Sequence, residues 1–138
     1  MTESEFISHW IGKPYRVRGN DEYGIDCWAL VVRYYRDVFG VELDDAYDDD
    51  IAGGFEHEIQ SGAWEPCEKK DAGVVFMAFD HSGEPRHVGI VVGSGEFILH
   101  SRKTRVQCDR MGVMRTHRLE FYRHVDNRHT AKEDSPTA

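Results

Sequence analysis

The amino-acid sequence predicts an α+β domain, with helices in its first half and an antiparallel sheet in its second. Between residues 27 and 39 apolar side chains recur at the helical spacing i, i+3, i+4, i+7. From Gly73 onward, short segments rich in Val, Ile and Phe follow one another, separated by turn residues. Because helices precede strands instead of alternating with them, we expect neighbouring strands to pair in antiparallel fashion.

Three helices are predicted, and the clearest covers residues 27–39. Asp26 supplies its N-cap and Gly40 its C-terminal stop. A short amphipathic helix is expected over 6–11, and a weaker one over 55–64. One face of the 27–39 helix carries Cys27, Leu30, Val31, Tyr34, Tyr35 and Val38.

Five strands are predicted after the helices. The segment 93–95, Gly-Ser-Gly, separates the second strand from the third and is typical of a tight hairpin turn. Residues 15–24, rich in Gly and Asn, are expected to form an irregular loop. The expected strands cover residues 73–79, 87–93, 96–101, 104–108 and 119–123.

The length of 138 residues fits a single domain with one hydrophobic core. We assign this domain to residues 1–126 and predict a disordered C-terminal tail over 127–138, which is polar and charged. The acidic segment 44–50 is interpreted as a solvated loop, because it lacks the central Gly and closing Glu of an EF-hand calcium site.

Composition excludes several classes of protein. Seventeen basic against 25 acidic residues give a formal net charge of −8, whereas a general nucleic-acid binder needs a basic surface. No stretch approaches the roughly 20 apolar residues of a membrane-spanning helix. The N-terminus has no basic region before an apolar run, so we expect synthesis in the cytoplasm without a signal peptide. Three scattered cysteines predict neither a zinc ribbon nor a disulfide scaffold.

Cys27 is the first candidate for chemistry. It directly follows the predicted N-cap, so its sulfur lies at the positive end of the helix dipole, which favours the nucleophilic thiolate. A nearby histidine would complete its activation. Taken alone, the position also fits an inert cysteine that fills the apolar helix face.

His87 and His100 lie at the outer ends of two strands of one predicted hairpin. If residues 94–95 form a two-residue turn, His87 opposes Arg102 and His100 is its diagonal neighbour, roughly 7–8 Å away at the backbone. A loop one residue longer would turn His100 to the opposite face. The pairing of the two histidines therefore requires a loop of even length, or a bulge that restores the parity.

Four segments in this order resemble the NlpC/P60 cysteine peptidases, especially the short members encoded in phage tail gene clusters. They extend from residue 11 to about residue 101, roughly two thirds of the chain. The segments are 11–15 (IGKPY), 24–31 (GIDCWALV), 87–93 (HVGIVVG) and 97–100 (FILH).

The resemblance implies a papain-like fold, in which the cysteine helix packs on an antiparallel sheet that carries both histidines. It implies that Cys27 attacks an amide carbonyl, that His87 takes and returns the proton, and that His100 orients His87. It implies no metal and no cofactor. The residues matched to substrate or oxyanion contacts are Tyr15, Asp26 and Trp28.

The sequence departs from the family pattern at several positions. Trp28 and Ala29 stand where Ser and Gly are common. The second histidine of the family commonly lies one residue closer to the first, where this chain has Leu99. Because side chains alternate along a strand, this offset of one residue bears on whether His100 lies on the same face of the sheet as His87.

Members of the family usually cut the stem peptides of bacterial peptidoglycan, often between D-γ-glutamyl and a diamino acid. The resemblance thus implies a cell-wall hydrolase carried by a phage tail or similar device. Tail-tip or baseplate proteins would be its partners, the virion tail its location, and the periplasm or cell wall its place of action. Alternatives are a tail-assembly protein that keeps the fold with little or no activity, a cell-wall amidase toxin, and a zinc enzyme using Cys27, His87 and His100.

Overall fold

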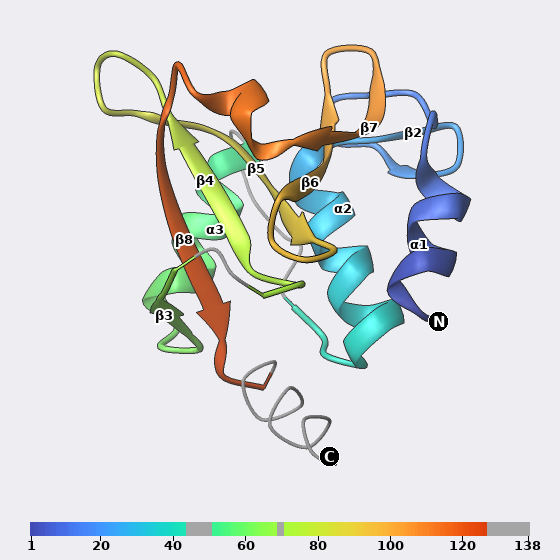
Figure 1. Ribbon diagram of the computed structural model, residues 1–138, viewed down its shortest axis with the longest axis horizontal. Helices are drawn as coiled ribbons and strands as arrows, with labels where there is room; N and C mark the ends of the chain where they lie inside the picture. Colours follow the sequence, from blue (N-terminus) through green and yellow to red (C-terminus); the bar gives the residue numbers. More distant parts are fainter. Residues whose placement is uncertain (44–50, 69–70, 127–138) are drawn as a thin grey trace.

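The computed structural model describes residues 1–43, 51–68 and 71–126 (Figure 1). The predicted acidic loop 44–50 and the predicted tail 127–138 lie outside these described residues. Among the residues described, every helix is too short or too polar to cross a membrane.

The chain from Trp64 onward forms a six-stranded sheet in the order β3-β8-β4-β5-β6-β7, and all of its pairings are antiparallel. Strands β4 to β7 are a meander, and β8 returns to pair with β4 after a short 3₁₀ helix, η2 (Met111–Met114). The strands are β3 (Trp64–Pro66), β4 (Val75–Phe79), β5 (Pro85–Val92), β6 (Phe97–Arg102), β7 (Arg105–Arg110) and β8 (Arg118–His124).

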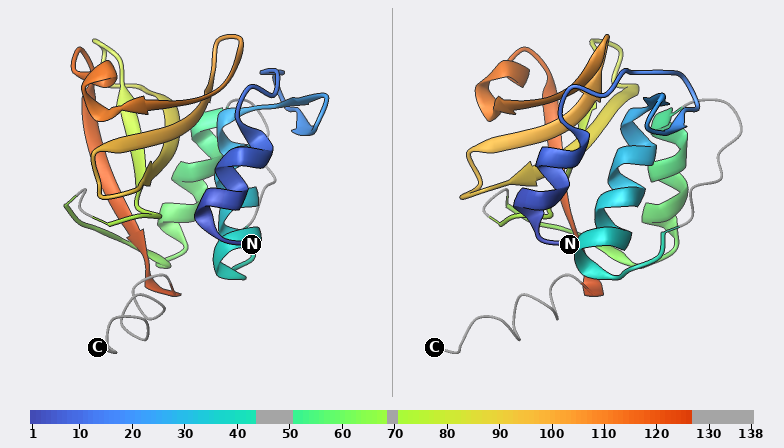
Figure 2. Two further views of the ribbon diagram at one scale, coloured as in Figure 1. Left: turned by 45° about the vertical axis from the view of Figure 1, so that its right-hand side comes forward. Right: turned by 90° about the vertical axis from the view of Figure 1, so that its right-hand side faces the viewer.

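Three helices gather on one side of this sheet (Figures 1 and 2). They are α1 (Glu3–Trp10), α2 (Cys27–Tyr34) and α3 (Ile51–Gln60). A π-helical turn, η1 (Tyr35–Phe39), extends α2, and Gly40 in the left-handed conformation (φ 72°) ends it. The predicted helix 27–39 is therefore confirmed, as are its N-cap and its stop.

The other two helices differ in extent from their predictions. Helix α1 begins three residues earlier than expected, because Thr2 and Glu5 form a capping box at its start. Helix α3 lies four residues before the predicted range, and Trp64, expected in that helix, begins β3. The expected irregular loop 15–24 contains a small ribbon, β1 (Asn20–Asp21) paired with β2 (Gly24–Ile25).

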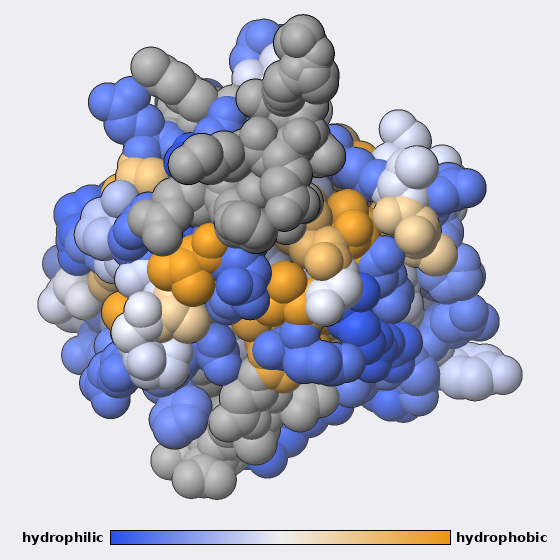
Figure 3. Space-filling model, turned by 90° about the horizontal axis from the view of Figure 1, so that it is seen from below, coloured by the Kyte–Doolittle hydropathy of each residue, from blue (hydrophilic) through white to orange (hydrophobic). Residues whose placement is uncertain are grey.

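Apolar side chains cover both faces of the central strand β4. Val75 and Met77 belong to the main core with the helices, whereas Phe76 and Ala78 belong to a second cluster on the opposite face. Since side chains alternate along a strand, a strand buried on both faces needs an unbroken apolar run, as β4 has. On the outer surface, most residues in the view from below are hydrophilic, with apolar ones showing at the centre (Figure 3).

Candidate active site

Cys27 is the first residue of α2, and Asp26 caps that helix. The Asp26 backbone is extended (φ −91°, ψ 179°), and its Oδ1 accepts a hydrogen bond from the backbone N–H of Ala29 at 2.8 Å. Asp26 has no exposed surface and Cys27 is only 1% exposed. The predicted cap is confirmed, and the contact of Asp26 with a substrate amine stays a prediction.

The sulfur of Cys27 lies beside β5. The backbone N–H groups of Val88, Trp28 and Cys27 itself favour its thiolate, and Val88 directly follows His87. Burial has the larger effect, however, and raises the pKa of the Cys27 thiol to about 12. The expectation that the helix dipole makes a resting thiolate is therefore wrong: desolvation at the helix start outweighs the dipole.

His87 and His100 meet side by side. The β5–β6 register pairs Ile90 with Leu99 and Val92 with Phe97, as an even loop requires. His87 Nε2 and His100 Nδ1 are 2.8 Å apart. The parity condition is thus confirmed, and Leu99, at the usual family position of the second histidine, faces the opposite side and is fully buried in the helix-side core.

Asp109, on β7, continues the row of polar side chains. Its Oδ2 lies 2.8 Å from His100 Nε2. The sequence analysis missed this residue, because the predicted strand 104–108 stopped one residue short of it. The β6–β7 register pairs Gln107 with His100, so Asp109 is the diagonal neighbour of His100 on the same face. The register argument that paired His87 with His100 across the β5–β6 hairpin would have identified Asp109 if it had also been applied to the β6–β7 hairpin.

Both imidazoles are held in the neutral form. Burial lowers the pKa of His87 first of all, and electrostatic interaction with His100, Arg102 and His117, each of which disfavours the protonated form of His87, lowers it further. Burial also lowers the pKa of His100, against the hydrogen bond and charge of Asp109, which raise it. At neutral pH the site therefore holds a protonated thiol and a neutral base.

Phe76 and Gly89 form the floor beneath the histidine pair. The Phe76 ring centroid lies 5.8 Å from that of His87 and 6.1 Å from that of His100. A Cβ added at Gly89 would lie 2.5 Å from a Phe76 ring carbon and 2.9 Å from His100 Cβ. The glycine of the HVGI segment is therefore required by close packing, a constraint that only the folded sheet reveals.

Tyr15 is held near the sulfur by the segment around it. Its backbone N–H donates to the carbonyl of Thr104 at 2.9 Å, and Pro14 forms a bridge with Arg105. The side chain is half-buried. Burial, followed by the charges of Cys27 and Asp26, raises the pKa of Tyr15 to about 12, so its hydroxyl stays a proton donor. The structure thus brings Tyr15 to the candidate site.

Trp28 does not join this group. Its ring has no exposed surface and packs against Phe55, with ring centroids 5.6 Å apart. Its indole N–H has no hydrogen-bond partner among the residues that the structure describes. The expected substrate contact is therefore corrected: the ring that follows the cysteine is part of the hydrophobic core.

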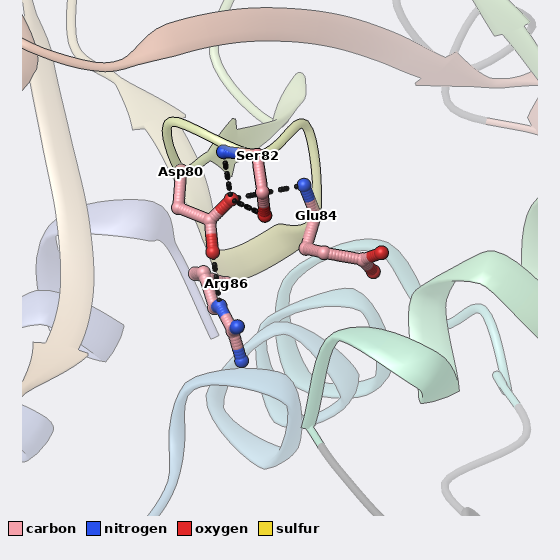
Figure 4. Close-up of polar contacts among 4 residues, drawn as sticks. All are labelled: Asp80, Ser82, Glu84 and Arg86. Atoms are coloured by element: carbon pink, nitrogen blue, oxygen red, sulfur yellow. Dashed lines mark hydrogen bonds and ion pairs between the residues drawn. The ribbon is translucent and has the colours of Figure 1, made fainter.

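The β4–β5 turn that precedes His87 is built around one carboxylate (Figure 4). Asp80 Oδ1 accepts hydrogen bonds from the backbone N–H groups of Ser82 and Glu84, at 2.9 and 3.0 Å, and from the Ser82 hydroxyl. Its Oδ2 accepts from Arg86 Nε at 2.6 Å. These donors lower the pKa of Asp80, and the contacts link the turn to Arg86, which directly precedes His87 on β5.

The structure gives no support to the alternative of a zinc enzyme using Cys27, His87 and His100. Within residues 1–43, 51–68 and 71–126, no group of three or more His, Cys, Asp or Glu side chains is arranged to hold a metal ion.

Comparison with curated proteins points to cell-wall hydrolases. Murein DD-endopeptidase MepH of Escherichia coli (strain K12) is 33% identical over 93 residues, which are 67% of this chain and 32% of that protein. Murein DD-endopeptidase MepS/Murein LD-carboxypeptidase of the same strain is 29% identical over 97 residues, 70% of this chain and 47% of that protein. The chain thus spans less than half the length of these two relatives.

Among solved structures, the NlpC/p60 domain of the peptidoglycan hydrolase SagA superposes with a TM-score of 0.59 at 18% identity. The match covers 85% of this chain and 92% of that one, and it confirms the predicted α+β, papain-like fold. A model of the NlpC/P60 family matches residues 12–123, which include both the cysteine helix and all three strands that carry the polar row. The chain belongs to the NlpC/P60 family.

Proposed function

We propose that this chain is a cysteine hydrolase that cleaves peptide bonds in the stem peptides of bacterial peptidoglycan. One observation carries the proposal: the His87–His100 pair, joined at 2.8 Å, lies next to the residue whose backbone N–H stabilises the Cys27 thiolate. The murein endopeptidases among its relatives support the choice of substrate. Family membership supports residues 1–126 as the catalytic unit, since the matched range lies within them.

The neutral resting pair defines the first chemical step. As Cys27 Sγ attacks the amide carbonyl, its proton passes to His87, and the carbonyl π electrons move onto oxygen. In this proposal the backbone N–H of Cys27 and the Tyr15 hydroxyl donate hydrogen bonds to this oxyanion. The C–N bond then breaks, the amine leaves with the proton from His87, and a thioester remains.

The second half of the reaction returns the enzyme to its starting state. His87 takes a proton from water as the water oxygen attacks the thioester carbonyl. When the C–S bond breaks, the proton returns to the sulfur and the carboxylic acid product leaves. His100 holds the His87 ring in place throughout both steps.

Substrate must reach a sulfur that is only 1% exposed. In this proposal the side chains that cover Cys27 therefore move when substrate binds, and the sulfur is shielded from solvent between turnovers.

The proposal is tested by digestion of purified sacculi and stem peptides with wild-type protein and with Cys27→Ala, the products being identified by mass. Cys108→Ala is the matched control, because Cys108 is exposed and lies outside the site. We expect wild type and Cys108→Ala to release the same fragments and Cys27→Ala to release none. Release by Cys27→Ala would show that Cys27 is not the nucleophile and would contradict the proposal. No release by wild type would contradict it as well and would favour the alternative of an inactive tail-assembly protein.

We further propose that the hydrolase is delivered by a phage tail or similar device, with tail-tip or baseplate proteins as partners and the cell wall or periplasm as its place of action. The support is the resemblance of the IGKPY and GIDCW segments to short members from phage tail gene clusters. Mass spectrometry of purified virions from a host that carries the gene is the test. If the protein is absent from all purified virions, delivery by a phage tail is disproved, whereas the proposal that the chain is a hydrolase is unaffected.

A further inference from the structure

Three polar side chains on adjacent strands form one continuous row beneath the candidate site. His87 is on β5, His100 on β6 and Asp109 on β7. Both links in the row, His87 Nε2 to His100 Nδ1 and His100 Nε2 to Asp109 Oδ2, measure 2.8 Å. His100, in the middle, is fully buried, so each of its ring nitrogens has a protein partner and neither faces bulk water.

From this row we infer that Asp109 is a positioning residue that selects the tautomer of His87, acting through His100. A carboxylate can only accept hydrogen bonds, and a neutral imidazole carries one N–H and one lone pair. Asp109 therefore requires the proton of His100 on Nε2, which leaves Nδ1 as an acceptor. The acceptor in turn requires the proton of His87 on Nε2.

The consequence appears at the far end of the row. With its proton on Nε2, His87 has its lone pair on Nδ1, the only ring nitrogen left to take the thiol proton from Cys27. In the opposite arrangement, His100 would carry its proton on Nδ1 and His87 would have to accept it at Nε2. His87 Nδ1 would then be protonated and unable to act as a base.

Charged groups around the pair shift the pKa values of both rings. Arg102 lowers the pKa of both imidazoles, and His117 lowers that of His87. Asp109, whose side chain is 29% exposed, is the group that raises the pKa of His100. Asp109 is thus the negative charge that reaches the pair from β7, through its contact with His100 Nε2.

The inference rests on the proposed hydrolase for its kinetic test, but its spectroscopic test does not need a substrate. Asp109→Leu keeps the approximate volume and removes the acceptor, whereas Asp109→Asn keeps a neutral oxygen that can still accept from His100. The matched control is Glu120→Gln on β8, a half-buried carboxylate that accepts from Arg118 and Tyr122 and touches neither histidine.

We expect Asp109→Leu to lower kcat by roughly 10- to 100-fold with KM unchanged, as loss of an orienting partner does. The decrease in kcat should be smaller in Asp109→Asn, and Glu120→Gln should keep the wild-type kcat. A wild-type kcat in Asp109→Leu, or a change in KM alone, would overturn the inference.

The second measurement is the nitrogen-15 NMR spectrum of the histidine rings at a pH where both are neutral. In wild type, Nε2 of His87 and of His100 should carry the proton, and in Asp109→Leu the Nδ1–H form should gain population. Should Asp109→Leu fail to fold, Asp109→Ala, which also lacks an acceptor, carries the same comparison. If wild type shows His100 protonated on Nδ1, or if the spectrum of the variant without an acceptor matches wild type, the role of Asp109 is disproved even in a chain with no hydrolase activity.

Discussion

Gly89 and His100 lie on neighbouring strands so close together that any side chain at position 89 would strike His100. An added Cβ would come within 2.9 Å of His100 Cβ, and within 2.5 and 2.7 Å of two ring carbons of Phe76. All of these atoms belong to the buried floor of the site, where neighbours cannot move aside freely. The position of His100, and through it that of His87, thus depends on a residue with no functional group.

Gly89→Ala is therefore expected to lose both stability and activity. Overpacking of this kind costs about 1–3 kcal/mol of unfolding free energy, measured by urea denaturation. Displacement of His100 should also lower kcat in the folded variant. Gly112→Ala is the control, since an added Cβ there meets nothing within 4 Å. If Gly89→Ala and Gly112→Ala have the same unfolding free energy and the same kcat, the packing of Phe76 and His100 around Gly89 is not rigid.

The pH dependence of kcat/KM should follow from the shifted pKa values of the proposed catalytic pair, Cys27 and His87. The active form holds one proton, on Cys27, with His87 neutral. Since the pKa of His87 is lowered, the second proton binds, and activity falls, only below the ordinary histidine value of 6.5. Since the pKa of Cys27 is raised, the last proton is lost only above the ordinary cysteine value of 9.0. If the plateau of the pH profile is narrower than the range from 6.5 to 9.0, groups other than Cys27 and His87 control the activity.

Arg102 is expected to set the acid side of that profile. Its positive charge lowers the pKa of both His87 and His100, so Arg102→Gln should raise both. Because protonated His87 cannot accept the thiol proton, the acid limb should move to higher pH, by up to about 1 pH unit. Arg105→Gln is the control: Arg105 opposes Arg102 on β7 but is exposed, and it is not among the groups that shift either histidine. An unmoved acid limb in Arg102→Gln would contradict this role.

Features set by short-range sequence patterns could be predicted. The cap by Asp26, the helix it starts and the stop at Gly40 each depend on residues within one helical segment. The pairing of His87 with His100 could also be predicted, as a condition on loop parity, because a tight hairpin turn fixes the register of the strands it joins.

Features that depend on distant segments could not be predicted. The return of β8 to β4 and the short edge strand β3 have no local pattern that identifies their partners. Burial of Trp28 against Phe55 likewise depends on where α3 packs, and the cysteine's protonation state depends on how completely the surrounding core excludes water. The contact of Asp109 with His100 is intermediate between local and distant features: it could have been predicted from the register of the β6–β7 hairpin, which joins two strands adjacent in the sequence.

The resting state of Cys27 gives the most direct test of this balance between dipole and burial. A helix dipole contributes about 0.3–1 kcal/mol, and at most about 2 kcal/mol, in favour of an anion. Complete burial can shift a pKa by up to about 3–5 units in the opposite direction, and one unit is about 1.4 kcal/mol. Burial therefore wins, and free Cys27 should react slowly with iodoacetamide, which attacks thiolates.

Peptide mapping during alkylation of the native protein at pH 7 checks this expectation. Exposed Cys108 should be labelled first, half-buried Cys67 next and Cys27 last. In urea all three should react at similar rates, because the difference in burial is lost. Fast labelling of native Cys27 at pH 6, ahead of Cys108, would instead indicate a thiolate–imidazolium pair at rest. Proton transfer to His87 would then precede substrate attack instead of accompanying it.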